Sequence, residues 1–252
     1  MSHHIIDVRD LCFAYPDGTE ALKGVSFRIV HGNAVAVVGA NGAGKSTLLL
    51  HLNGYLSPGR GEVRIGETPL TRATAVGVRR TVGMVFQDPD DQLFMPTVFE
   101  DIAFGPVQSG LPAEEVERRA TMALERVGMA HLRDRPPYRL SAGEKRAVTI
   151  ATVLAMEPAI LVMDEPSSNL DPRGRRRLIE LLRSFEHTRI IATHDLELVV
   201  ELCSRVILLD GGRIAADGPT LELLNDEQLM LAHGLERPHS LCHLHPHMDA
   251  QK

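Results

Sequence analysis

Short apolar runs separated by turn signals make up the first third of the chain. Residues 5–9 and 25–29 alternate apolar and polar positions, as half-buried strands do, and Pro16-Asp17-Gly18 between them is a turn signal. Residues 34–38 are continuously apolar, which is typical of a strand buried on both faces. The pattern further predicts a helix over residues 47–52 and strands over residues 62–65 and 81–86.

The pattern becomes helical between about residues 97 and 156. Pro112 followed by Ala113-Glu114-Glu115 is a good helix start. Ser141 with Glu144 three residues later is a capping-box pattern, which predicts that Ser141 opens another helix. This part of the chain is therefore expected to be a helical insertion.

Alternating elements return after Pro158. Residues 160–163 read as a strand, and Asp171-Pro172 reads as an N-cap followed by proline at the first helical position. The helix after it is expected to bury Leu178, Leu181, Leu182 and Phe185, which are spaced i, i+3, i+4, i+7. Strands are expected over residues 189–192 and 205–209, around a helix near residues 196–202. The coarse prediction is an α/β fold in which parallel α/β halves flank a helical insertion.

Composition and charge narrow the function classes. The 252 residues carry a formal net charge of −6, so no basic excess points to nucleic acid as a partner. Cys12, Cys203 and Cys242 are an odd and scattered set, which predicts no disulfide framework and a reducing compartment. The longest apolar runs are strand-sized, whereas a membrane span needs about 20 apolar residues. The chain is expected to be soluble, with any membrane crossing left to other subunits.

A glycine-rich loop follows the apolar strand. Residues 39–46 fit the pattern GxxxxGK[ST] between a predicted strand and a predicted helix, which is the context of a phosphate-binding loop. Backbone N–H groups of such a loop surround phosphates, Lys45 reaches the β- and γ-phosphates, and Ser46 is a ligand for Mg²⁺. The residues expected to contact ATP here are Gly39, Asn41, Gly42, Gly44, Lys45, Ser46 and Thr47.

Two acids end the predicted strand at residues 160–163. Asp164 is expected to hold Mg²⁺, and Glu165 is the candidate general base that activates the attacking water. Removing such a base typically lowers the rate by roughly 10²–10⁴-fold. Without the phosphate loop, solvated acids at a strand end would be a strong alternative interpretation of the same pair.

The segment Leu140-Ser141-Ala142-Gly143-Glu144 resembles the signature motif of ATP-binding-cassette (ABC) ATPases. This chain has Ala142 where the family usually has Gly, and Glu144 where Gln is common. The resemblance implies a phosphate-loop NTPase core with an N-terminal antiparallel β-subdomain and an inserted α-helical subdomain. It implies one nucleotide-binding domain over residues 1–236, with the helical subdomain over roughly 97–156. It also implies that Ser141, Ala142, Gly143 and Glu144 face ATP held by a second ATPase subunit.

Four further residues fall at positions that match family motifs. Tyr15 resembles the aromatic residue that stacks on adenine, although it could instead pack on the core as a strand-end tyrosine. Gln87 resembles the glutamine that senses Mg²⁺ and water, and His194 the histidine that contacts the γ-phosphate. Asp171 resembles the end of the loop that couples the two sites across the dimer, and it can also cap its helix.

The segments at residues 87–94 and 154–158 resemble the ATPases of energy-coupling-factor importers for vitamins and transition metals. In that branch, residues after the glutamine line a groove for a coupling helix of the transmembrane scaffold. Acidic Asp88, Asp90 and Asp91 beside apolar Leu93 and Phe94 suit a basic amphipathic helix. The alternative interpretation is an ordinary acidic surface loop.

The C-terminal segment, residues 237–252, is rich in His and Pro and reads as a tail. Within the branch such a tail resembles the cobalt and nickel members, which also have a metal-binding membrane subunit, and cobalt is slightly favoured. A tail without metal remains the alternative.

The resemblance implies a homodimer peripheral to the cytoplasmic face of the membrane. A heterodimer, a vitamin importer, a soluble ATPase acting on nucleic acid or ribosomes, and a metal-storage protein remain alternatives. The candidate metal ligands near the C-terminus are His233, His239, His243, His245 and His247, with Cys242 among them.

Overall fold

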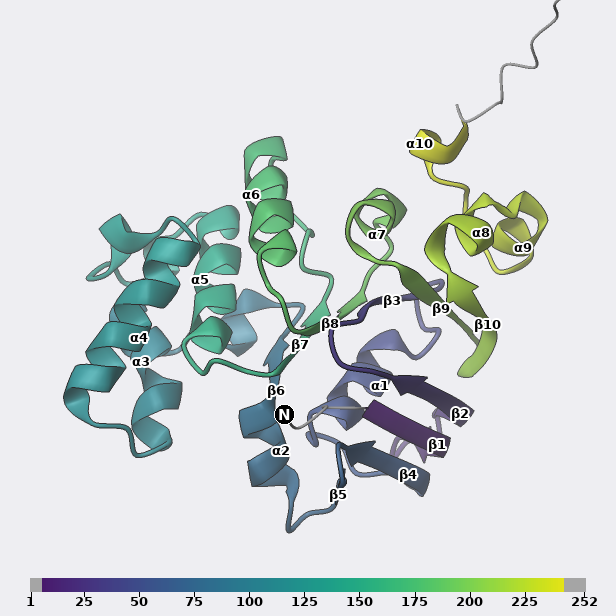
Figure 1. The fold of residues 1–252 in the computed structure, drawn as a ribbon, viewed down its shortest axis with the longest axis horizontal. Helices are drawn as coiled ribbons and strands as arrows, with labels where there is room; N and C mark the ends of the chain where they lie inside the picture. Colours follow the sequence, from purple (N-terminus) through teal and green to yellow (C-terminus); the bar gives the residue numbers. More distant parts are fainter. Residues whose placement is uncertain (1–5, 243–252) are drawn as a thin grey trace, which may run out of the picture.

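Two β-sheets organise the chain in the computed structural model, which describes residues 6–242 (Figure 1). The first sheet has the order β2-β1-β4-β5, and its neighbouring strands are antiparallel. It confirms the expected antiparallel β-subdomain near the N-terminus. Its strands are β1 (Ile6–Ala14), β2 (Glu20–Ile29), β4 (Arg60–Ile65) and β5 (Thr68–Pro69).

The second sheet has the order β10-β9-β3-β8-β7-β6. Its neighbours pair in parallel, except that β10 runs antiparallel to β9. Because parallel strands end at one edge of the sheet, the segments that follow β3, β7 and β8 are brought together there. Its strands are β3 (Ala34–Val38), β6 (Val82–Val85), β7 (Ile160–Asp164), β8 (Thr188–Ala192), β9 (Arg205–Asp210) and β10 (Arg213–Pro219).

Strand β3 is shared by two hydrophobic cores. All five of its residues are buried, as the continuous apolar run predicts. Val35 and Val37 belong to a core that includes α1 (Lys45–Leu52) and the antiparallel sheet. Ala36 and Val38 face the opposite core, which extends into the helical subdomain. The alternation of a pleated strand thus places β3, and the loop that follows it, between two packed layers.

Three helices form the expected helical insertion, seen in teal at one side of the molecule (Figure 1). Ser141 and Glu144 make both hydrogen bonds of the predicted capping box, so the expected helix start is confirmed. A second capping box joins Thr97 to Glu100 at the start of α3. The helices are α3 (Val98–Gln108), α4 (Ala113–Arg126) and α5 (Ala142–Leu154), with short 3₁₀ turns at Pro89–Asp91, Ala130–Leu132 and Pro137–Arg139.

Helices of the C-terminal half cover the face of the parallel sheet opposite α1 (Figure 1). Asp171 caps the first of them by accepting a 2.6 Å hydrogen bond from the Gly174 N–H, which confirms the predicted N-cap. Together with the two sheets these helices confirm the α/β fold class. They are α6 (Pro172–Arg183), α7 (Leu196–Leu202), α8 (Thr220–Asn225), α9 (Glu227–Ala232) and α10 (His239–Cys242).

Several local expectations are corrected. The strand expected over residues 81–86 spans only Val82–Val85, because Thr81 ends an unpredicted helix, α2 (Ala75–Thr81). Leu181 and Phe185, which were expected to be buried, are only half-buried, and Phe185 lies beyond the end of α6. The tail expected from residue 237 stays in contact with the core at first, since Leu241 is buried and the Ser240 N–H donates to Glu197. His243, His245 and His247 lie outside the described residues. No helix among residues 6–242 is long and apolar enough to cross a membrane.

Candidate nucleotide-binding site

The loop after β3 has a backbone that only glycine fits at two positions. Gly39 has φ +150°, and a Cβ there would lie 2.2 Å from the carbonyl oxygen of Leu209 on β9. Gly44 has φ +104°, and a Cβ there would lie 2.6 Å from the carbonyl oxygen of Ala21. Gly42 has φ +79°, but a Cβ there would meet no atom within 4 Å. The backbones of Leu209 and Ala21 thus pack closely against the loop at Gly39 and Gly44, whereas the space beside Gly42 is open, as a phosphate-binding loop requires.

Lys45 and Thr47 tie the start of α1 to this loop. The Lys45 ammonium is buried and donates to the carbonyl oxygens of Gly39, at 2.8 Å, and Ala40, at 3.1 Å. The Thr47 hydroxyl is 3.0 Å from the hydroxyl of Tyr15. Tyr15 therefore lies beside the loop, as expected for a residue that contacts the nucleotide, and it also packs edge-to-face on Phe13. Both interpretations of Tyr15, adenine stacking and core packing, are compatible with this place.

Asp164 ends β7, and one of its two carboxylate oxygens makes no hydrogen bond within residues 6–242. Its Oδ1 is buried without a hydrogen-bond partner among the described residues. Burial raises the pKa of Asp164, an effect that a hydrogen bond from Ser46 opposes and the neighbouring charge of Glu165 reinforces. A buried carboxylate oxygen without a partner is costly unless a cation or a donor satisfies it. Asp164 and the Ser46 hydroxyl are thus a donor set of the kind that Mg²⁺ prefers.

Glu165 follows Asp164 with a left-handed backbone, at φ +47°, and is buried. Its carboxylate accepts hydrogen bonds from the Thr193 hydroxyl, at 2.9 Å, and from the His194 backbone N–H, at 3.1 Å. The His194 imidazole Nδ1 lies 2.9 Å from Glu165 Oε2. Residues from the ends of β7 and β8 therefore meet here, and the structure brings Glu165 and His194 together. A non-glycine residue with positive φ is a common sign of a functional constraint.

The segment at residues 141–144 lies at the start of α5, in the helical insertion. Ser141 and Ala142 are exposed, while Glu144 turns back so that its carboxylate accepts from both the N–H and the hydroxyl of Ser141, each at 2.8 Å. Among residues 6–242, no hydrogen bond joins this segment to the phosphate loop. The start of α5 therefore presents small residues and helix N–H groups outward rather than to the loop of its own chain.

Arg146 fastens α5 to the segment around Gln87. Its guanidinium is buried and donates to the carbonyl oxygens of Phe86, at 2.8 Å, and Gln87, at 2.5 Å. Gln92 adds a second link, because its side chain bonds both the Phe86 N–H and the Thr152 hydroxyl. The Gln87 side chain itself is exposed and makes no hydrogen bond within the described part of the chain. The structure therefore leaves Gln87 free to reach a ligand but does not join it to Asp164.

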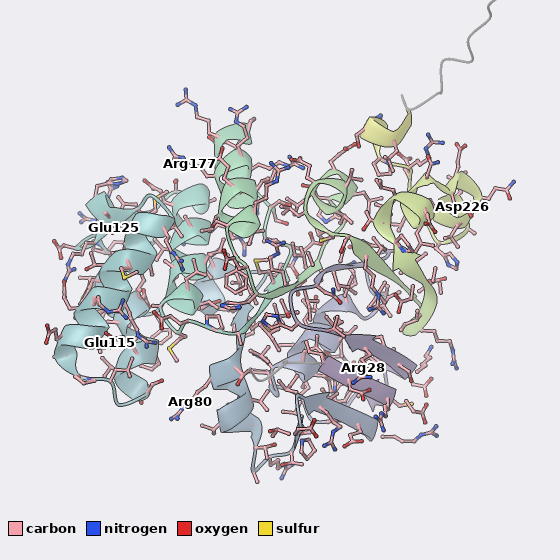
Figure 2. The ribbon with its side chains drawn as sticks, in the orientation of Figure 1. Arg28, Arg80, Glu115, Glu125, Arg177 and Asp226 are labelled. Carbon is pink, nitrogen blue, oxygen red and sulfur yellow. The ribbon has the colours of Figure 1, made fainter. Side chains whose placement is uncertain are left out.

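A hollow of about 840 Å³ lies between α5 and α6. Ser141, Ala142, Gly143 and Glu144 line it together with Asp171, so the structure brings the two expected dimer-facing segments to one place. Glu125 of α4 and Arg177 of α6 also border it, and Figure 2 labels both residues on their helices. Asp171 uses its Oδ1 as a helix cap, which leaves its other oxygen available.

Sequence reasoning missed Thr193 and Arg146. Thr193 carries no motif of its own, and its only signal is its place directly before His194. Arg146 lies one turn into a helix, where an arginine is usually exposed. Among the described residues, no group of three or more His, Cys, Asp or Glu side chains could hold a metal ion. Two of the histidines named near the C-terminus are described, and they have separate partners: His233 pairs with Asp210 at 2.9 Å, and His239 lies near Glu197.

Fold and site together define a phosphate-loop ATPase. Comparison with known proteins narrows this class, because residues 22–168 match the ABC transporter family. The chain is 67% identical, over 96% of its own length and 97% of the relative's, to an ABC transporter ATP-binding protein of Geobacter sulfurreducens. It is 47% identical to the energy-coupling factor transporter ATP-binding protein EcfA of Methanothermobacter thermautotrophicus, over 93% of this chain and 77% of that protein.

The fold matches a solved member of the same group. CbiO1 of Clostridium perfringens, part of the ABC transporter complex CbiONQ, superimposes with a TM-score of 0.79 at 39% identity, over 91% of this chain and 94% of that one. The chain therefore belongs to the ABC transporter family and is an ATP-hydrolysing transporter subunit.

Proposed function

We propose that this chain is the ATPase subunit of an energy-coupling-factor importer, and that its cargo is a transition-metal ion, with cobalt ahead of nickel. The observation that carries the proposal is the segment at residues 87–94, which places acidic side chains and the exposed Phe94 at the surface beside the helical subdomain. Leu93, which was expected on the same surface, is buried in the core instead. The similarity to EcfA and to CbiO1 supports it, since both are ATPases of transporter complexes. The His-rich tail is the reason to favour metal over a vitamin, which remains the alternative cargo.

The docking surface has an aromatic centre with an acidic border. Phe94 is 63% exposed and meets Phe104 of α3 edge-to-face, with ring centroids 5.1 Å apart. Val107, one turn further along α3, is 54% exposed. Asp90, four residues before Phe94 in the chain, is exposed and pairs with Lys145 of α5 at 2.5 Å. Exposed aromatic rings that contact each other are typical anchors of a protein interface, and the acids favour a basic helix as the partner.

Two copies of the chain are proposed to form the working unit. Members of the family work as dimers. In this chain the start of α5 presents its small residues outward, and no hydrogen bond joins it to the phosphate loop of the same chain within residues 6–242. We therefore place Ser141, Ala142 and Gly143 of one copy against ATP on the loop of the other. A homodimer is favoured because one chain carries every expected ATP-contacting motif.

The residues have separate tasks in hydrolysis. Lys45 leaves the carbonyl oxygens of its loop to bind the β- and γ-phosphates, and Tyr15 lies against the base. Ser46, Asp164 and Gln87 are the candidate ligands of Mg²⁺, which neutralises phosphate charge when it is bound. Glu165 is the candidate general base and takes the proton of the attacking water, while His194 orients the γ-phosphate. The roles of Lys45, Glu165 and His194 are supported by their places after β3, β7 and β8, which end at one edge of the parallel sheet.

Association with membrane subunits tests the proposal. The chain should copurify with an energy-coupling-factor scaffold, and Phe94→Ala should weaken that association about 10-fold or more, as expected for an interface anchor. Leu231→Ala is the matched control, because Leu231 is equally exposed, at 63%, but lies on α9. Failure of the chain to bind any such scaffold would overturn the proposal.

Uptake measurements decide the cargo. Cells that express the assembled importer should accumulate labelled Co²⁺, with Ni²⁺ as the next candidate. Accumulation of a vitamin without either metal would assign the chain to the alternative. Peripheral attachment to the cytoplasmic face of the membrane is part of the same proposal, and it requires the scaffold.

A further inference from the structure

Thr193 lies at the centre of the site, although no sequence motif assigns it a task. It directly follows β8, and its side chain has no exposed surface. Its backbone N–H donates to the carbonyl oxygen of Val37 on β3, at 3.2 Å. The residue is thus fixed between the strand that leads into the phosphate loop and the acid Glu165.

The direction of the Thr193 hydrogen bonds follows from their partners. The Asp195 backbone N–H donates to Thr193 Oγ1 at 3.0 Å, so the hydroxyl oxygen is the acceptor in that contact. Its other contact is Glu165 Oε2, at 2.9 Å. An ionised carboxylate only accepts, and the hydroxyl has one proton, so Thr193 donates to Glu165.

The amide that orients the hydroxyl is itself anchored. The Asp195 side chain accepts from the Leu198 N–H at 2.9 Å, which caps α7. The same carboxylate pairs with Arg175 of α6 at 3.2 Å. Asp195 is therefore held from two helices, and its N–H can serve as a fixed donor. The Thr193 hydroxyl has one well-defined orientation as a result.

Glu165 has two kinds of partner on this side. The His194 side chain is 67% exposed, whereas Glu165 is 8% exposed at its side chain. An exposed imidazole can turn toward a bound nucleotide and leave the carboxylate, but the buried Thr193 cannot. We propose that Thr193 is a positioning residue that holds the Glu165 carboxylate in place when His194 turns away. The proposal rests on the assignment of Glu165 as the general base.

A pair of substitutions separates the hydroxyl from the rest of the side chain. Thr193→Val keeps the branched shape and removes the hydroxyl, and Thr193→Ser keeps the hydroxyl. We expect Thr193→Val to lower kcat for ATP about 10- to 100-fold, as a misplaced catalytic group does, with KM changed less than about threefold. Thr193→Ser should stay within about threefold of the parent kcat. If Thr193→Val does not fold, Thr193→Ala is measured in its place.

Thr188→Val is the matched control. Thr188 is the first residue of β8, the strand that Thr193 directly follows. It is 1% exposed, and its hydroxyl accepts a hydrogen bond from the Gly32 N–H. Its kcat should remain within about twofold of the parent value. The proposal is overturned if Thr193→Val keeps the parent kcat, if it raises KM alone, or if Thr193→Ser loses as much activity as Thr193→Val.

Glu165→Gln distinguishes failure of this inference from failure of the base assignment. Hydrolysis lost in Glu165→Gln together with a fully active Thr193→Val refutes only the role of Thr193. Parent activity in Glu165→Gln removes the base assignment, and the role of Thr193 falls with it. Binding of a fluorescent ATP analogue in each variant shows that the nucleotide site has formed.

Discussion

Arg146 offers a sharp test of how the helical insertion is attached to the core. Its guanidinium joins α5, which begins at Ser141, to the carbonyl oxygens of Phe86 and Gln87. Arg146→Met removes both donors but keeps an unbranched side chain of similar reach. The two carbonyl oxygens would then lose their bonded partner. We expect the substitution to lower the stability of the protein and to loosen the attachment of α5 to the segment around Gln87.

The size of the effect follows from two opposing terms. Each hydrogen bond from a charged donor is worth about 1.5–3 kcal/mol. The stabilisation by these hydrogen bonds is reduced because the charge of the guanidinium is buried. Burial lowers the pKa of Arg146, and the nearby negative charge of Asp88 acts in the opposite direction. Desolvation of a buried ion typically cancels part of its hydrogen-bond energy. We therefore expect Arg146→Met to lower the free energy of unfolding by about 2–4 kcal/mol.

Denaturation by urea, followed by circular dichroism, measures this difference. Arg118→Met on α4 is the control, because Arg118 pairs with Glu115 while its side chain is 48% exposed. An exposed pair of this kind contributes little to stability, because solvent screens it. Equal losses in the two variants would show that the buried link does not fasten the insertion. An Arg146→Met protein of parent stability but reduced ATPase activity would limit the link to a functional role.

Three further predictions concern the nucleotide site. Ala142→Gly should hydrolyse ATP at the parent rate or faster, since it removes a methyl group where helix N–H groups approach phosphate; a large loss in a steady-state ATPase assay would give that methyl group a role. Gly39→Ala should abolish binding of a fluorescent ATP analogue, because the new Cβ would lie 2.2 Å from the Leu209 carbonyl oxygen; retained binding would contradict the tight cradle. Burial raises the pKa of Asp164, so ionising it destabilises the nucleotide-free protein as the pH rises above the ordinary carboxyl value. Asp164→Asn should therefore raise the Tm of that form more at pH 8 than at pH 5 while hydrolysis is lost; a pH-independent shift would contradict this account.

Local signals of the sequence predict much of the fold. The apolar run of β3 and the capping box at Ser141 each depend only on residues close together in the sequence, and the structure confirms both. Helix α2 was missed because Ala75-Val76-Gly77-Val78 has little helix propensity and no cap hydrogen bond marks its start. Packing against the core decides its conformation instead.

The site residues also divide into those that local sequence predicts and those that depend on contacts between distant parts of the chain. Motif spacing predicts the phosphate loop, and the pair of acids after a strand predicts a role for Glu165, whereas the role of His194 was inferred from the family resemblance. The roles of Thr193 and Arg146 depend on contacts that cross 28 residues in one case and about 60 in the other. Such contacts exist only once the strands are ordered side by side. The finer assignments, among them Tyr15 on adenine and Asp171 at the dimer, depend on a bound nucleotide and a second chain.

The place of β3 has a consequence for how the protein is made. Its two partners in the sheet are β8 and β9, which end at Ala192 and Asp210. The phosphate loop is encoded early, yet the carbonyl oxygen against which Gly39 rests belongs to Leu209. We therefore expect the loop to reach its final conformation during synthesis only after the chain beyond residue 210 has left the ribosome. A nascent chain should then bind and hydrolyse ATP only once β8 and β9 have been translated and paired with β3.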